Sequence, residues 1–208
     1  MISSQDIARS AIYKYLSLAI DYPVGLVAEM LGSGFLFAEI VAHLEKLPAA
    51  YQALTGELPI LQKELSGFAE LEDLQVAYTS HFDLAANKHS FSLYESDNIM
   101  QEAKAEKISG FLADLESFYG RTGIALSDRD MPDHLTTELE FMHFLCSQEL
   151  FDLQADFLKL HLSNWIPPLA QSFLKRETFP FYTSLIMLIA NYVQVDGDHI
   201  SPAVISSD

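Results

Sequence analysis

Apolar residues recur at intervals of three and four positions through most of the chain, which is the spacing of one face of an α-helix. In the first such segment, Ser3 and Asp6 resemble a capping box, in which a hydroxyl and a carboxylate bind the free amides of the first turn. Tyr22 and Pro23 end this helix, because proline disfavours a helical conformation in the preceding residue. The stripe consists of two adjacent rows, Ile7, Ala11, Tyr15 and Leu18 beside Ala8, Ile12, Leu16 and Ala19.

The same periodicity predicts further helices, separated by glycine, proline and aperiodic stretches. Two short helices flank Gly32-Ser33-Gly34, and a long helix is expected to begin at Asp97 and to end at Gly120. The segment from Phe181 to Val193 is apolar nearly all round, which indicates a central helix. Residues 196–208 are expected to form a loose tail.

Neither a sustained alternation of apolar and polar residues nor a repeat of fixed length is present, so sheet and solenoid folds are not indicated. No linker rich in proline, glycine or serine divides the chain. Half of the 208 residues are apolar, which is enough to bury a substantial core. The sequence therefore predicts an all-α fold, a single domain over residues 1–208 built as a bundle of about nine or ten helices.

The formal net charge of −17 disfavours binding to nucleic acid and to anionic membranes, since both are negatively charged. It favours a basic partner, although solubility alone explains the charge equally well. Cys146 is the sole cysteine, so no disulfide can form within the chain, which fits a reducing compartment. The N-terminus lacks the features of a secretory signal, and the most apolar run, Leu185–Ala190, is too short to span a bilayer. We expect a cytoplasmic protein without stable membrane insertion.

Sequence signatures of catalysis are absent from the chain. It has no glycine-rich phosphate-binding motif and no serine-nucleophile motif, and Cys146 is at a core-like helical position that favours a structural thiol. Glu140 and His143 form one Glu-x-x-His pair, whereas carboxylate-bridged di-iron bundles use two. His134 and His143 face opposite sides of a helix and cannot share an ion. We expect no enzymatic activity, no metal and no cofactor.

One candidate binding region surrounds an irregular connection at residues 85–93, which lack helical periodicity. Loops beside binding sites tend to be the least stable parts of a protein, so we expect this loop to be mobile and to border a peptide site. Its flanks hold the aromatic and acidic residues Tyr78, Phe82, Asp83, Tyr94 and Glu95.

A second candidate is the start of a helix near residue 132. Pro132 suits the first turn, where Asp133 would face the positive helix end and His134 would titrate near neutral pH. The alternative is a helix cap with an incidental histidine, and spacing alone favours this simpler interpretation.

Several short motifs follow one another in a distinctive order between Leu16 and Pro167, which is most of the chain. They are Asp21-Tyr22-Pro23, Phe82-Asp83, Ser92-Leu93-Tyr94-Glu95-Ser96, Pro132-Asp133-His134 with Glu138-Leu139-Glu140-Phe141-Met142, and His161-Leu162-Ser163-Asn164-Trp165-Ile166-Pro167. In order and spacing this series resembles the TorD/DmsD/NarJ family of redox-enzyme maturation chaperones.

The resemblance implies an all-helical chaperone, monomeric or a domain-swapped dimer. It would bind the N-terminal, often twin-arginine, signal peptide of a molybdopterin oxidoreductase catalytic subunit. It would hold that subunit until cofactor insertion is complete and then permit export or assembly. The peptide-binding residues expected from the motifs and their surroundings are Asp133, His134, Tyr94, Glu95, Tyr78, Phe82, Asp83, Glu138 and Trp165.

The chain departs from the family pattern at two places. Asn87-Lys88-His89-Ser90-Phe91 replaces a proline-rich loop, and Leu169 stands where an aromatic residue often follows the tryptophan segment. The mixed character suggests a client of the dimethylsulfide, ethylbenzene, selenate or chlorate type. A helical adaptor for another peptide and a small helical enzyme or metalloprotein are the alternatives.

Overall fold

The computed structural model describes residues 2–82, 90–127, 131–176 and 179–205, with side chains described up to residue 200. Over these residues every regular element is helical, and one isolated antiparallel bridge joins Tyr94 and His134. The predicted all-α fold is therefore confirmed. The α-helices are α1 (Ser4–Ile20), α2 (Gly25–Gly32), α3 (Phe35–Leu44), α4 (Ala49–Gln52), α5 (Leu58–Leu65), α6 (Leu71–Phe82), α7 (Glu95–Ile99), α8 (Ala105–Gly120), α9 (Leu135–Ser147), α10 (Phe151–Phe157), α11 (Ser163–Phe173) and α12 (Pro180–Ile205). A 3₁₀ turn, η1 (Ala53–Glu57), precedes α5, and a π-helical turn, η2 (Leu158–Leu162), precedes α11.

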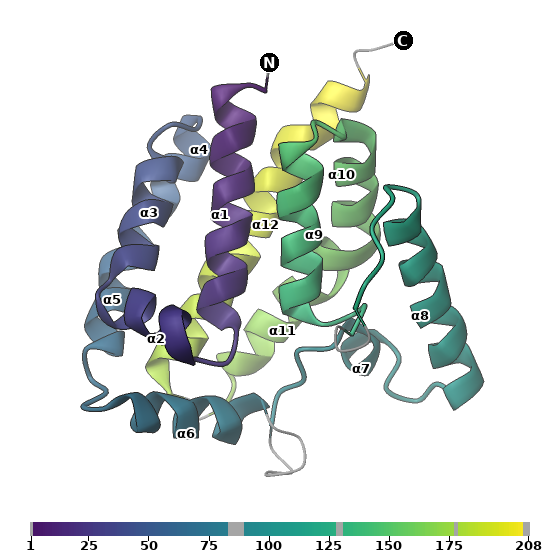
Figure 1. Ribbon diagram of the computed structural model, residues 1–208. Coiled ribbons are helices and arrows are strands. Elements are labelled where there is room, and N and C mark those ends of the chain that lie inside the picture. The colour runs from purple at the N-terminus through teal and green to yellow at the C-terminus, as the bar shows by residue number, and fades with distance from the viewer. Residues whose placement is uncertain (1, 83–89, 128–130, 177–178, 206–208) are drawn as a thin grey trace.

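Helices α1, α9 and α12 lie in the middle of the molecule, with α3 and α5 on one side and α8 and α10 on the other (Figure 1). Helix α1 packs against α9 and α3, while α12 packs against α10 and α11. Helix α6 lies across one end of the bundle, where α2, α7 and α11 are also found (Figure 1). This end therefore brings together segments from the first, middle and last thirds of the chain.

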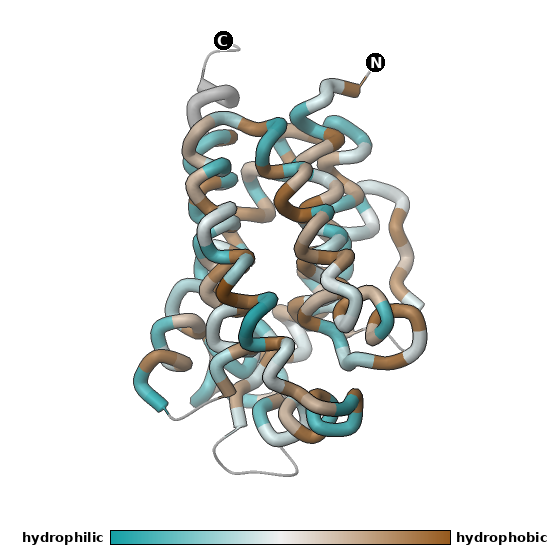
Figure 2. The backbone as a smooth tube through the Cα atoms, turned by 90° about the vertical axis from the view of Figure 1, so that its left-hand side faces the viewer, coloured by the Kyte–Doolittle hydropathy of each residue, from teal (hydrophilic) through white to brown (hydrophobic). Residues whose placement is uncertain are grey.

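The packing follows from the predicted helical stripes. Ser3 accepts a hydrogen bond from the amide of Asp6 at 3.0 Å, so the predicted cap of α1 is confirmed. Leu185, Ile186 and Val193 of α12 are fully buried, as expected of a central helix. Apolar and polar positions interleave along the helices on the side where α3 and α5 lie, as in amphipathic surface helices (Figure 2).

No single helix in the described part of the chain is both long and apolar enough to cross a membrane. The pair α2 and α3 passes the criteria of length and composition only when the two are taken together, and they are bent by 69° at their junction.

The long helix expected from Asp97 is in fact two helices, since α7 ends at Ile99 and α8 begins at Ala105. The side chain of Asn98 donates hydrogen bonds to the carbonyls of Ser92 and Tyr94, at 3.0 and 2.8 Å. These bonds hold α7 against the segment that precedes it and fix the start of this short helix.

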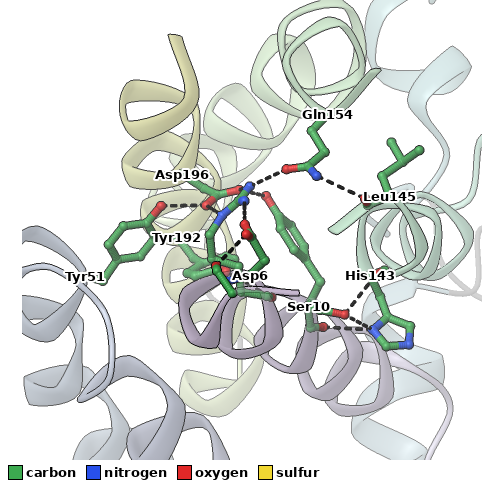
Figure 3. Close-up of polar contacts among 11 residues, drawn as sticks. Asp6, Ser10, Tyr51, His143, Leu145, Gln154, Tyr192 and Asp196 are labelled. Atoms are coloured by element: carbon green, nitrogen blue, oxygen red, sulfur yellow. Dashed lines mark hydrogen bonds and ion pairs between the residues drawn. The ribbon is translucent and has the colours of Figure 1, made fainter. Parts of the chain in front are cut away.

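The loose tail expected from Asp196 is wrong for the described residues, because α12 continues to Ile205. Asp196 is fully buried and accepts hydrogen bonds from Arg9 Nε at 2.6 Å, Tyr13 Oη at 2.7 Å and Tyr51 Oη at 2.6 Å (Figure 3). These contacts tie α12 to α1 and α4. Gly197 and Asp198 are weak helix formers, so local propensity gave no sign that tertiary contacts extend the helix.

Candidate functional site

Four segments of the chain meet at the end of the bundle where α1 ends. The ring of Tyr22, just after α1, lies edge-on to Tyr78 of α6 with 5.2 Å between centroids. Tyr94 lies edge-on to His134 at 4.9 Å. The carboxylate of Asp21 is close enough to act electrostatically on both Tyr78 and His134. We call these five residues, Asp21, Tyr22, Tyr78, Tyr94 and His134, the tyrosine patch.

The tyrosine patch can be reached from solvent. Asp21 and Tyr22 are exposed, and the other three residues are half-buried. Burial raises the pKa of Tyr78, and the nearby Asp21 and Tyr94 raise it further, so this phenol stays protonated at neutral pH. The patch therefore presents neutral aromatic rings beside an exposed carboxylate.

Backbone hydrogen bonds fix the relative positions of Tyr94, which precedes α7, and His134, which precedes α9. The amide of Glu95 donates to the carbonyl of Asp133, and the amide of Leu135 donates to the carbonyl of Leu93, both at 2.8 Å. This short bridge sets Tyr94 directly opposite His134. The start of α9 and the start of α7 consequently form one rigid unit.

His134 is the N-cap of α9 and lies just before its first turn. Its Nδ1 accepts a hydrogen bond from the amide of Thr136 at 3.3 Å, which requires this nitrogen to be unprotonated. Burial lowers the pKa of His134, and Asp21 and Asp133 only partly oppose this effect. His134 is therefore neutral at physiological pH, since its pKa lies below its ordinary value.

Asp133 was predicted to lie in the first turn of α9. It instead caps the start of another helix. Its Oδ2 accepts hydrogen bonds from the amide and the hydroxyl of Ser96 in α7, at 3.1 and 2.6 Å. Asp133 is only 1 % exposed. It therefore supports Tyr94 and α7 from inside the fold, and a direct contact between Asp133 and a ligand stays a prediction. The sequence pattern placed Pro132 in the first turn of this helix, whereas the observed N-cap is His134.

A pair of buried carboxyl groups lies beneath the patch. Glu95 and Glu138 are both fully buried. Glu95 Oε2 is 2.8 Å from His161 Nδ1, and Glu138 Oε2 accepts a hydrogen bond from Trp165 Nε1 at 3.0 Å. The π-helical turn η2 carries His161, so an irregular helix presents this ring to Glu95.

The two carboxyl groups also interact with each other. Burial raises the pKa of Glu138, and the charge of the neighbouring Glu95 raises it further. Glu138 therefore holds a proton beside Glu95, and neither Oε1 of Glu95 nor Oε1 of Glu138 has a hydrogen-bond partner among the described residues. The pair thus joins α7 to η2 and α9 to α11.

The structure sorts the expected peptide-binding residues into two groups. Tyr78, Tyr94 and His134 lie on the tyrosine patch. Glu95, Asp133, Glu138 and Trp165 are buried beneath it, and Phe82 is only 9 % exposed and packs against Tyr78 and Tyr182. Asp83 and most of the expected loop, 85–93, lie outside the described residues.

Sequence reasoning missed two members of the patch, Asp21 and Tyr22, as binding residues. They were interpreted as the end of the first helix and as part of a family motif, but were not counted among the binding residues. The available signal was an aromatic and an acidic residue immediately before a proline that ends a helix, since such residues are left at the surface.

Residues with catalytic or metal-binding potential are not arranged for either role in the described part of the chain. No three histidine, cysteine or acidic side chains there come together as metal ligands. Cys146 is fully buried, and burial raises the pKa of its thiol. Glu140 forms an exposed ion pair with Lys14 at 2.8 Å, and His143 binds Ser10, so the Glu-x-x-His pair is divided between two structural contacts.

We expect Asp133→Ala to lower the free energy of unfolding by about 1–2 kcal/mol, because the start of α7 loses its acceptor. Hydrogen exchange should accelerate at the amides of α7, and urea denaturation should show the loss. Asp152→Ala is a matched control, since this exposed carboxylate lies in the first turn of α10 and its loss should change stability by less than about 0.5 kcal/mol. Equal losses in the two variants would contradict a capping role for Asp133.

Comparison with known proteins supports the motif-based assignment. The family model described as the nitrate reductase delta subunit matches residues 45–171, more than half of the chain. The perchlorate reductase assembly chaperone protein of Dechloromonas aromatica is 26 % identical over 204 residues, covering 91 % of this chain and 88 % of that protein. The selenate reductase assembly chaperone protein of Thauera selenatis is 32 % identical over 167 residues, covering 73 % and 78 %.

Two further relatives connect the sequence to the fold. The chaperone protein TorD of Photobacterium profundum is 36 % identical over 76 residues, covering 31 % of this chain and 35 % of TorD. The crystal structure of a candidate redox enzyme maturation protein from Archaeoglobus fulgidus shares the fold, with a TM-score of 0.52 and 22 % identity over 89 % of this chain and 93 % of that one. The chain therefore belongs to the nitrate reductase delta subunit family of redox-enzyme maturation chaperones, and it is a chaperone rather than an enzyme.

Proposed function

We propose that this chain is the dedicated assembly chaperone of a molybdopterin oxidoreductase, and that the tyrosine patch binds the N-terminal peptide of the catalytic subunit. Relatives named as assembly chaperones of perchlorate, chlorate and selenate reductases support a reductase client. The chaperone would act in the cytoplasm and hold the subunit until its cofactor is inserted.

The observation that carries this proposal is that the Tyr-Glu-Ser and Pro-Asp-His motifs, 36 residues or more apart, share one surface. Each motif contributes an aromatic side chain to the patch, Tyr94 from the first and His134 from the second. The carboxylate next to each ring is buried, and it binds His161 in the case of Glu95 and Ser96 in the case of Asp133. The motifs are thereby explained as one accessible surface and its internal support.

The chemistry of the patch suits a peptide with a basic end. A guanidinium group is attracted to the faces of tyrosine rings and to a carboxylate such as Asp21. The net charge of −17 adds a long-range attraction for such a peptide. A twin-arginine peptide has two guanidinium groups. One of them can bind at Tyr22 and the other at Tyr94.

The test is calorimetric titration with a synthetic peptide that carries two consecutive arginines followed by an apolar run. We expect the double variant Tyr22→Ala and Tyr94→Ala to weaken binding by about 1–2 kcal/mol, or roughly fivefold to thirtyfold. Higher salt should weaken binding to the wild-type protein as well.

Phe151→Ala provides the control, because Phe151 is also an exposed aromatic residue, 43 % exposed, but belongs to α10. Its affinity for the peptide should equal that of the wild-type protein. If the tyrosine variant and this control bind equally well, the tyrosine patch is not the peptide site.

A further inference from the structure

An open cleft of about 780 Å³ lies between α2, α5 and α6 and is lined also by the turns that follow α2 and α5. It is separate from the tyrosine patch and contains none of the five patch residues. Its volume is in the range of sites that bury small ligands or several side chains of a peptide. Apolar residues from four segments line it, namely Leu31 of α2, Leu65 of α5, Phe68 of the following turn, and Leu71 and Leu74 of α6.

The rim of this α2–α6 cleft is acidic. Glu29 and Glu70 line the cleft and are exposed. The chain from residue 21 to residue 82 contains nine acidic residues and only two basic ones, Lys46 and Lys63. An apolar floor with a negative rim complements an apolar segment that has basic residues next to it.

One side of the cleft contains Gly32, which has no side chain to fill the space. Gly25 and Gly34, which also line the cleft, have positive φ angles of 51° and 73°, so their backbone conformation accounts for glycine. Gly32 has no positive φ angle, and no atom lies within 4 Å of the position that a Cβ would take. Neither the backbone nor internal packing therefore requires glycine at this position, and its small size leaves space in the cleft.

The cleft adjoins the tyrosine patch along two segments. Leu74 lines the cleft, and Tyr78 of the patch follows one turn later on α6. The chain also passes from Tyr22 in the patch to Gly25 in the cleft through Pro23, whose carbonyl accepts a hydrogen bond from Gln75 of α6 at 2.8 Å. A bound chain can therefore continue from one surface to the other.

We propose that the α2–α6 cleft binds the apolar segment of the peptide whose basic end lies on the tyrosine patch. This inference rests on the proposed function and adds the location of the second half of the ligand. Burial of apolar side chains in the cleft supplies affinity, while the patch and the acidic rim orient the basic end.

Filling the cleft by Gly32→Leu tests the inference. A helical leucine is intrinsically more favourable than glycine, so the variant should fold at least as stably as the wild-type protein. We expect it to bind the peptide with two arginines and an apolar run about tenfold more weakly or worse, because apolar side chains are displaced. A second peptide, with the two arginines and serines in place of the apolar run, should bind wild type and Gly32→Leu equally.

Gly110→Leu is the matched control, since Gly110 is an exposed glycine of α8 with open space at its Cβ position and does not line the cleft. Its affinity for both peptides should be that of wild type, and thermal unfolding should confirm that both variants are folded. Unchanged binding of the apolar peptide to Gly32→Leu overturns the cleft assignment. If the tyrosine variants still weaken binding in that case, the proposed function stands; if neither set of variants has an effect, both proposals fall.

Discussion

Asp196→Ala is expected to lower the free energy of unfolding by about 3–5 kcal/mol, the range observed when one member of a buried ion pair is removed. Arg9 is 1 % exposed, and its guanidinium donates to both carboxylate oxygens of Asp196, at 2.6 and 2.9 Å. Burial alone would lower the pKa of Arg9, but the charge of Asp196 and its hydrogen bonds outweigh burial and raise it. Without Asp196 the buried guanidinium keeps its charge and loses its principal counter-ion.

The remaining contacts of Arg9 do not replace Asp196. Its Nη1 donates to Asp6 Oδ1 at 3.0 Å and its Nη2 donates to Gln154 Oε1 at 2.8 Å (Figure 3). These bonds orient the guanidinium, but the variant also leaves the hydroxyls of Tyr13 and Tyr51 without their acceptor. Each buried donor left unpaired adds to the loss of stability.

Urea denaturation followed by circular dichroism measures this effect. Lys14→Ala is the control, on the helix that carries Arg9, because the ion pair of Lys14 with Glu140 is exposed and typically contributes about 0–1 kcal/mol. A loss for Asp196→Ala no larger than that for Lys14→Ala would show that the buried network does not hold α12 in place.

Glu138→Gln is expected to make the protein more stable than wild type at pH 8, with a difference that shrinks toward pH 5. Burial and the neighbouring Glu95 raise the pKa of Glu138 in the folded protein. A group with a raised folded pKa contributes stability that is fully present below its unfolded pKa and is lost as the pH rises through the folded pKa. The glutamine amide is neutral at every pH, can accept from Trp165 and can donate to Glu95.

Comparison with Glu138→Ala separates the effect of charge, which both variants remove, from the effects of hydrogen bonding and volume, which only the alanine variant removes. The alanine variant leaves Trp165 Nε1 without its acceptor, and should lose about 1–3 kcal/mol for this buried donor. Unfolding curves of the three proteins at pH 5, 6.5 and 8 provide the measurement. If Glu138→Gln and wild type keep the same difference at all three values, the carboxyl groups do not share a proton.

Much of this protein could be predicted from local sequence patterns. A helical stripe depends on residues three and four positions apart, so the helices with clear stripes, among them α1 and α12, were recognisable without tertiary information. The cap at Ser3 depends only on the first turn of α1 and was also correct. The order of the motifs between Leu16 and Pro167 indicated the family, which the match over residues 45–171 confirmed.

The tertiary structure alone decided what the acidic motif residues do. Asp133 is close in sequence to the start of α9, yet its carboxylate caps α7 through Ser96. Glu95 and Glu138 are charged residues that sequence patterns favour at the surface, but packing buries them as a pair beside His161 and Trp165. The position of a side chain on its own helix does not specify which distant group will satisfy it.

The tyrosine patch and the C-terminal part of α12 also depended on tertiary contacts rather than on local helix signals. Periodicity placed Tyr22, Tyr78 and Tyr94 on separate segments, and only the packing of α6 beside the end of α1 makes them neighbours. Likewise, α12 continues past Gly197 because Arg9, 187 positions earlier, binds Asp196. The sequence by itself determined the helices and the family, since those depend on short-range patterns. The tertiary structure decided the accessible surface and the buried partners, since those depend on contacts between residues far apart in the chain.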